Sequence, residues 1–276
     1  MRLLSLSLAL VLMPGSLLSA AHTPRPVAPQ EVFAPFWSVQ PGWHTELMIR
    51  NNTTQQLSVL PVLRRRTGSE VPLEPVVLAG NEAKMIPVAE VLGRVAPGVV
   101  SEADAFGSVV FRYQAVAAGN IYASVLLGRT GSPIEFHFDA ARTIPDFTSG
   151  SYESIWWRPD KDLQETLILA NLLERELRGN LRVFDAKGRS VKHPFVLAAR
   201  ETQQISLTEL LNRDQIAGEY GGVSIEPQDH PGYLQAMHFT INEAAGLGAL
   251  LKVFPRSELP ETEFTTPRAN ASSCLS

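Results

Sequence analysis

Cysteine is almost absent from this chain: Cys274 is the one thiol among 276 residues. A single thiol cannot form an internal disulfide, so apolar cores must hold the fold together. Positive charge is not in excess either, because the formal net charge is −4, and we therefore expect no nucleic-acid partner. Hydrophobic residues make up 45% of the chain and charged residues 19%, which excludes a largely disordered protein.

The chain also lacks an apolar run of about 20 residues, the length that a membrane-spanning helix needs. The run from Leu3 to Met13 is shorter, follows Arg2, and is followed by the small residues Ser19, Ala20 and Ala21. This order predicts a secretory signal peptide over residues 1–21, with an uncleaved membrane anchor as the alternative. We expect a secreted or periplasmic protein with no transmembrane segment after cleavage.

The motifs by which many enzymes are found are missing as well. The sequence has no Gly-x-Ser-x-Gly nucleophile elbow, no phosphate-binding loop and no dinucleotide fingerprint. A metal site needs three or four converging ligands. The six histidines show no close ligand spacing: His22, His44, His137, His193, His230 and His238. We therefore expect no metal or other cofactor and no catalytic activity, with a hydrolase kept as the third hypothesis.

What the sequence does contain is an internal repeat. An offset of 120 residues aligns Phe36-Trp37 with Trp156-Trp157 and Asn51 with Asn171. After one deletion, an offset of 119 aligns the segment 78–92 with the segment 197–211. Six of those 15 positions are identical, where composition alone would give about one match. The identical positions in the first copy are Leu78, Ala79, Glu82, Ile86, Glu90 and Leu92.

Each copy is about 110 residues long, which is the size of a domain. We predict one domain over residues 29–141 and a second over residues 142–256, joined by a connector from Arg142 to Ser151. Residues 257–276 are polar, contain two prolines and lack a periodic apolar pattern, so we expect a flexible tail.

Within each copy, short apolar runs alternate with turn residues at the spacing that is typical of a β-sandwich. The first copy's expected strands are 31–39, 45–50, 56–63, 71–78, 82–87, 107–114, 121–127 and 134–138. Ser206 and Glu209 form a capping box for a short helix, and Pro87 to Glu90 stand at the matching place. The sequence thus predicts an all-β fold of two tandem immunoglobulin-like antiparallel β-sandwich domains, each with one short helix.

All four tryptophans lie near the starts of the copies, at Trp37, Trp43, Trp156 and Trp157. Neighbouring residues on a strand point to opposite faces, so only one of Trp156 and Trp157 can enter a given core. These four rings are the candidate ligand-binding residues, because exposed aromatic rings can stack on sugars. The alternative is that they pack in the cores and between the domains.

The basic run Arg64-Arg65-Arg66 could bind phosphate or carboxylate groups, but the second copy lacks it. It is interpreted as a solvated hairpin tip, because the net charge of the chain provides no supporting field. Duplication without a catalytic signature favours an exported, non-catalytic structural or protein-interaction module. Its expected partner is a protein or glycan of the envelope or the extracellular space. Carbohydrate binding through exposed aromatic rings is the alternative function.

Overall fold

The computed structural model describes residues 27–100, 105–143, 150–158 and 162–256. These residues form a predominantly β structure in which every strand pairing is antiparallel. The predicted signal peptide over residues 1–21, the predicted tail over residues 257–276 and Cys274 lie outside the described residues. The all-β part of the fold prediction is therefore confirmed.

Residues 28–141, the first half, contain two sheets. Sheet A has the strand order β1-β7-β3-β4, with β5 also paired to β3, and sheet B has the order β6-β2-β8-β9. The elements of this half are β1 (Ala28–Ser38), β2 (Trp43–Asn51), β3 (Leu57–Arg65), β4 (Glu70–Pro72), β5 (Val76–Leu78), β6 (Ala83–Pro87), α1 (Val88–Val95), α2 (Pro97–Val100), β7 (Phe106–Ala115), η1 (Ala118–Asn120), β8 (Ile121–Arg129) and β9 (Glu135–Asp139).

Residues 150–256, the second half, contain two further sheets. Sheet C has the order β13-β12-β15-β10-β18, and sheet D has the order β14-β11-β16-β17. The elements are β10 (Ser151–Trp157), β11 (Gln164–Asn171), β12 (Leu177–Asp185), β13 (Ser190–Leu197), β14 (Thr202–Ser206), α3 (Leu207–Arg213), β15 (Tyr220–Pro227), η2 (Pro231–Tyr233), β16 (Leu234–Asn242), β17 (Leu247–Leu251) and β18 (Phe254–Arg256).

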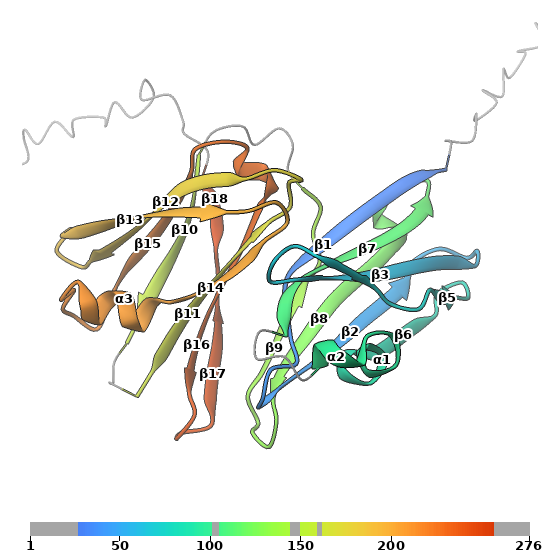
Figure 1. The fold of residues 1–276 in the computed structure, drawn as a ribbon, viewed down its shortest axis with the longest axis horizontal. Coiled ribbons are helices and arrows are strands. Elements are labelled where there is room, and N and C mark those ends of the chain that lie inside the picture. Colours follow the sequence, from blue (N-terminus) through green and yellow to red (C-terminus); the bar gives the residue numbers. More distant parts are fainter. Residues whose placement is uncertain (1–26, 101–104, 144–149, 159–161, 257–276) are drawn as a thin grey trace, which may run out of the picture.

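The two halves lie side by side and have matching strand orders (Figure 1). The order β1-β7-β3 of sheet A corresponds to β10-β15-β12 of sheet C, and sheet B corresponds strand for strand to sheet D. In each half, a helix follows an edge strand. The helix α1 follows β6, which pairs with β2, and the helix α3 follows β14, which pairs with β11. The recurring apolar order in the sequence therefore coincides with a recurring strand order.

Most of the strands expected in the first copy are present with small shifts of their ends, but one is wrong. The expected strand 71–78 is divided into β4 and β5, which pair with different parts of β3. Pro72 and Pro75 explain the division, because proline has no backbone N–H to donate across a sheet. The first half also contains the single-turn helix α2 in addition to the expected helix.

A turn anchored by asparagine recurs in both halves. The Nδ2 atom of Asn51 donates to the carbonyls of Gln55 and Ala79 at 2.6 and 2.9 Å. Asn171 makes the corresponding bonds, both 2.8 Å, to Arg175 and Ala198. Such bonds satisfy backbone carbonyls where the chain leaves the sheet, and they explain why this asparagine recurs.

The recurring glutamates have structural roles of the same kind. The carboxylate of Glu82 accepts the backbone N–H of Ala79 at 2.7 Å, and that of Glu201 accepts Ala198 at 2.6 Å. The predicted N-cap of α3, the helix of the second half, is confirmed, because Ser206 Oγ accepts the N–H of Glu209 at 3.2 Å. The turn bonds account for the recurrence of Glu82 and Glu201, because each satisfies a backbone N–H group.

The apolar cores do not follow the boundary between the halves. The core between sheets C and D is confined to the second half, whereas the core of the first half continues into sheet D. Its members from the second half are Ile168, Met237, Phe239 and Ile241. These residues lie on the face of sheet D that points away from its own core, so sheet D packs on two sides.

Candidate functional site

Trp37 and Trp156 occupy the same position in the two halves. Trp37 is paired with Gly107 and donates its Nε1–H to the carbonyl of Arg64 at 3.1 Å. Trp156 is paired with Gly221 and donates to the carbonyl of Phe184 at 3.0 Å. Both indoles have no exposed surface. They are core residues, with the buried N–H satisfied in each case.

This equivalence corrects the alignment of Trp37 with Trp157. β1 contains a β-bulge between Ala34 and Trp37, where the pairing with β7 shifts by one residue, and β10 has no such shift. An extra residue in one strand moves every later side chain to the opposite face. The equivalent of Trp157 is therefore Ser38, since both follow the buried tryptophan.

The third tryptophan, Trp43, belongs to the contact between the halves. Its ring lies 5.9 Å from Phe239 and 6.4 Å from Phe136, measured between centroids, and these two phenylalanines are 5.1 Å apart. The guanidinium of Arg129 stands over Trp43 at 4.7 Å and also forms an ion pair with Glu243 of the second half. Trp43 is thus a half-buried packing residue.

Trp157 alone of the four is largely exposed, with 55% of its surface accessible. It is paired with Tyr220, which is 57% exposed, and Ile155 on the same face of β10 is 64% exposed. The prediction that Trp156 and Trp157 face opposite sides of their strand is confirmed by these burial values. The ligand-binding role of the four tryptophans stays a prediction.

The exposed surface of Ile155, Trp157 and Tyr220 has a covered counterpart in the first half. Phe36 corresponds to Ile155 and is 1% exposed, and Phe106 corresponds to Tyr220 and is 6% exposed. The ring of Phe36 lies 6.4 Å from Phe239, a residue of the second half. Phe239 of the second half therefore helps to cover this surface in the first half, whereas the equivalent surface of the second half is exposed.

The outer face of sheet A forms another part of the contact between the halves. Phe33, Val62 and Val110 are buried there in a small apolar cluster with Leu172 of the second half. The register of the sheets places Glu153, Arg182 and Ser224 at the corresponding positions of sheet C. At these three positions the face of sheet A is apolar and covered, whereas the face of sheet C carries polar or charged side chains beside the exposed Ile155 and Trp157.

The interpretation of Arg64-Arg65-Arg66 as a solvated hairpin tip is wrong for Arg64. Its side chain is 4% exposed and bonds Glu70 at 3.1 Å, and the backbone carbonyl of Arg66 accepts Thr202 N–H from the second half at 3.0 Å. The hairpin tip is packed against the turn between β13 and β14 of the second half, so it is not a solvated tip.

Glu70 stands at the centre of this charged contact. Arg112 holds its carboxylate with two bonds of 2.8 and 2.9 Å, and Arg200 of the second half lies 3.5 Å away. Desolvation opposes ionisation, but the hydrogen bonds and charges of Arg112 and Arg64 outweigh it, so the pKa of Glu70 is lowered. Burial also lowers the pKa of Arg64, against its hydrogen bond to Glu70. Arginine nevertheless stays charged at neutral pH.

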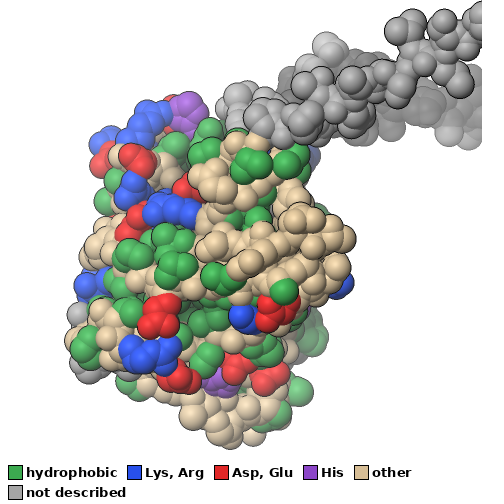
Figure 2. Space-filling model, turned by 90° about the vertical axis from the view of Figure 1, so that its right-hand side faces the viewer, with side chains coloured by type: hydrophobic (Ala, Val, Ile, Leu, Met, Phe, Trp, Pro, Cys, Tyr) green, Lys and Arg blue, Asp and Glu red, His purple; other side chains and the backbone are tan. Residues whose placement is uncertain are grey.

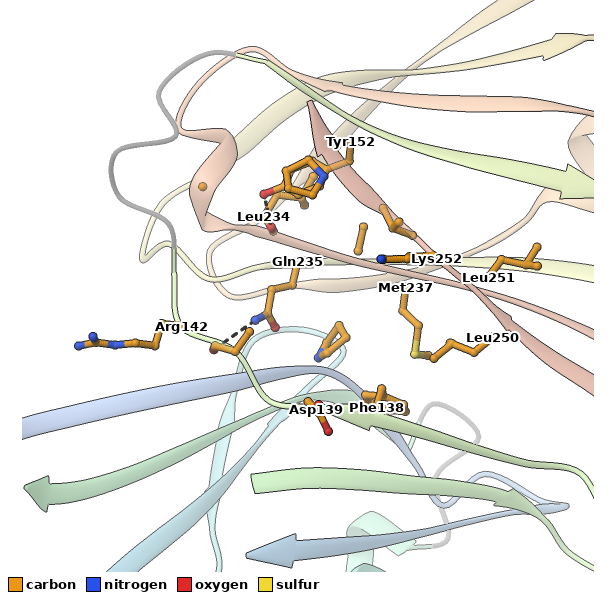
Figure 3. A pocket seen from close by; sticks show the side chains of 16 residues that line it. Phe138, Asp139, Arg142, Tyr152, Leu234, Gln235, Met237, Leu250, Leu251 and Lys252 are labelled. Atoms are coloured by element: carbon orange, nitrogen blue, oxygen red, sulfur yellow. Dashed lines mark hydrogen bonds between the residues drawn. The ribbon is translucent and has the colours of Figure 1, made fainter. Parts of the chain in front are cut away.

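A pocket of about 300 Å³ lies between the halves (Figure 3). Its walls are mainly apolar and come from β9, β16, β17 and the start of β10, with Phe138, Met237 and Leu250 among them. The amide of Gln235 donates to the carbonyl of Phe33 at 3.0 Å, while its buried Oε1 atom has no hydrogen-bond partner.

Tyr152 closes one side of the pocket. Its hydroxyl oxygen lies 2.6 Å from the carbonyl oxygen of Pro231 and 2.9 Å from that of Leu234, and these two acceptors share its single proton. Burial raises the pKa of Tyr152, so the hydroxyl stays neutral. No sequence motif marked this pocket, because its walls come from segments that are about 100 residues apart in the chain.

One polar constellation inside the second half resembles a catalytic triad in composition. Ser154 Oγ lies 2.9 Å from His238 Nδ1, and His238 Nε2 lies 2.6 Å from Glu165 Oε2. The three residues are 8%, 0% and 1% exposed, and none of them lines the pocket. A nucleophile must reach its substrate, so the constellation is better explained as a buried hydrogen-bond network.

The described residues contain no group of three His, Cys, Asp or Glu side chains that could hold a metal ion. None of the helices in the described ranges is long and apolar enough to cross a membrane. On the face of the molecule in Figure 2, acidic and basic side chains are interspersed, so this face presents no patch of one charge sign.

No known family model matches the chain, and no curated protein matches its sequence. A crystal structure of a β-glucuronidase from Bacteroides uniformis is similar at 11% identity over 84% of this chain, with a TM-score of 0.18. The chain spans 26% of the length of that protein. A similarity this weak supports no argument about fold or activity.

Proposed function

We propose that the chain is an exported, non-catalytic protein-interaction module made of two tandem immunoglobulin-like domains. The domain assignment is supported by the recurring strand order and by the equivalent Trp37 and Trp156. Export is supported by the apolar segment of residues 1–21 alone. The fold by itself does not give a function, so the interaction role depends on one surface.

The observation that carries the proposal is the open surface of Ile155, Trp157 and Tyr220. In the first half the corresponding surface is buried by aromatic contact with Phe239. Soluble proteins rarely gather exposed apolar side chains on one surface unless it binds something, and this surface keeps three large ones. Large exposed aromatic residues on a rigid sheet are typical anchors of protein interfaces. We assign this surface to a partner protein.

Site-specific photocrosslinking tests the assignment. A photoreactive phenylalanine analogue placed at position 157 should give a discrete protein adduct in the native host, and Tyr220→Arg should abolish it. The same analogue at the exposed position 85 of sheet B is the matched control. Adducts of equal yield at both positions, or none at position 157, would contradict the proposed surface.

Carbohydrate binding is the second candidate, and the same surface favours it. Trp157 and Tyr220 are paired on neighbouring strands and both expose more than half of their surface, so their rings are accessible for stacking on sugars. A glycan array should then give signals that Trp157→Ala removes and that Met85→Ala leaves unchanged. An array without any signal would remove this candidate while leaving the protein-interaction role in place.

A further inference from the structure

β17 is an edge strand of sheet D that lacks the usual protective residues. It pairs with β16 on one side, and no backbone hydrogen bond from the described residues reaches its other side. Edge strands are usually protected by charges or proline. Each other edge strand of at least five residues here carries a charge, a proline or several polar side chains, whereas β17 reads Leu-Gly-Ala-Leu-Leu.

The side chains of this edge are exposed despite their apolar character. Leu247 is 64% exposed and Leu250 is 40% exposed. Gly248 packs on the first half, because a Cβ atom at that position would lie 2.6 Å from Ile134. The face toward the first half is therefore partly covered by the segment that contains Ile134 and Phe136. The outer backbone edge of β17 makes no backbone hydrogen bond within the described residues, and residues 247–250 are exposed, which is what strand addition requires.

The pocket between the halves lies at the end of this edge, since Leu250 and Leu251 line it (Figure 3). Its volume of about 300 Å³ is small for an organic cofactor and suits one or two side chains. The unpaired Gln235 Oε1 atom is a hydrogen-bond acceptor that a ligand N–H would satisfy. A peptide offers both an apolar side chain and an N–H.

The charged side chains at the pocket favour a ligand of one charge sign. Lys252 and Arg142 line it, and Lys252 forms no ion pair within the described residues. Its ammonium group lies 4.4 Å from the centroid of the Phe254 ring. Asp139 is the acidic residue of the lining, and it already accepts the hydroxyl of Tyr122. The cationic groups are thus in excess, and they complement a carboxylate.

We propose that β17 and this pocket form a docking site for an extended acidic peptide segment of a partner protein. The segment adds as a strand to the open edge of β17. One apolar side chain enters the pocket, and a neighbouring carboxylate meets Lys252. The inference deepens the proposed interaction role but uses a site separate from the surface of Trp157, so each can fail alone.

Fluorescence anisotropy with two labelled decapeptides tests the proposal on the full exported chain. Both peptides alternate valine and threonine around a central leucine, and two aspartates in one are replaced by two lysines in the other. The acidic peptide should bind at least tenfold more tightly. Leu250→Asp should abolish its binding, and Lys252→Glu should weaken it at least tenfold and favour the basic peptide. Lys187→Glu at an exposed hairpin turn is the matched control and should have no effect.

Hydrogen exchange supplies the readout that pocket occupation alone would not change. Binding of the acidic peptide should protect the backbone amides of residues 247–251, and Trp157→Ala should leave this protection intact. Equal binding of both peptides, binding that Leu250→Asp does not reduce, or unprotected amides in β17 would each overturn the docking site. Loss of the crosslinks at position 157, with peptide binding retained, would instead contradict only the proposed partner surface.

Discussion

The two halves have matching strand orders but differ in where their apolar surface lies. At three matching positions, the outer face of sheet A carries Phe33, Val62 and Val110, while sheet C carries Glu153, Arg182 and Ser224. The first set is buried in a cluster with Leu172 of the other half, whereas the second set consists of polar or charged side chains. The strand order therefore fixes the architecture, whereas a few outward-facing side chains decide which faces dock.

The largest effect should come from the feature that the halves share. Trp37→Ala and Trp156→Ala should each lower the free energy of unfolding by about 3–5 kcal/mol, because each removes a fully buried indole. Trp157→Ala should change it by less than about 0.5 kcal/mol. Urea denaturation of the three variants measures these changes. A large cost at Trp157, or a small one at Trp156, would contradict the equivalence of Trp37 and Trp156.

A smaller effect should come from the buried network that only the second half contains. The first half has Ala34, Thr45 and Val125 at the positions of Ser154, Glu165 and His238, as the strand registers show. Removing one member of a buried network leaves its partners without hydrogen bonds. His238→Val alone should therefore cost about 1–3 kcal/mol of unfolding free energy.

The triple replacement Ser154→Ala, Glu165→Thr and His238→Val should cost less than the sum of the three single replacements. The first half shows why. Thr45 Oγ1 accepts the Ser38 N–H at 2.9 Å, and Glu165 accepts the equivalent Trp157 N–H at 3.2 Å, so a threonine at position 165 is expected to keep this bond. Urea denaturation of the single and triple variants provides the comparison. Additive costs would mean that the three residues do not act as one network.

The smallest of these effects should be the pH dependence of the charged contact. The pKa of Glu70 lies below its ordinary value of 4.5 in the folded chain, so its stabilising effect is present above that value and is lost as the pH falls below it. Glu70→Gln should make stability less dependent on pH in this acidic range. Thermal unfolding from pH 5 downward measures the difference, and Glu46→Gln is the control. Parallel pH profiles for wild type and Glu70→Gln would show that Glu70 is not responsible.

The sequence predicted the strands and the opposite orientations of Trp156 and Trp157 because both depend on local alternation. It did not reveal the β-bulge before Trp37, since an extra residue in one strand shows only against its partner strand. The contact between the halves does leave a signal in the sequence: β1 from Val32 to Ser38 is buried on both faces, and such strands read as continuous apolar runs.

The pocket and the buried network could not be read from the sequence for a different reason. Ser154 and His238 are 84 residues apart, and only the pairing of whole sheets brings them within 2.9 Å. The same holds for Phe138 and Leu250, which meet at the pocket across the boundary between the halves. Sequence spacing carries no information about such contacts unless the docking of the halves is already known.

Calorimetry of the wild-type chain and of Val62→Arg tests most directly whether the halves form one docked unit. The wild type should unfold in a single transition, because the apolar core of the first half continues into sheet D. Val62→Arg copies Arg182 onto the covered face, places a charge beside Arg64, and should split the curve into two transitions. Two transitions in the wild type that Val62→Arg leaves unchanged would show that the two halves do not form one docked unit.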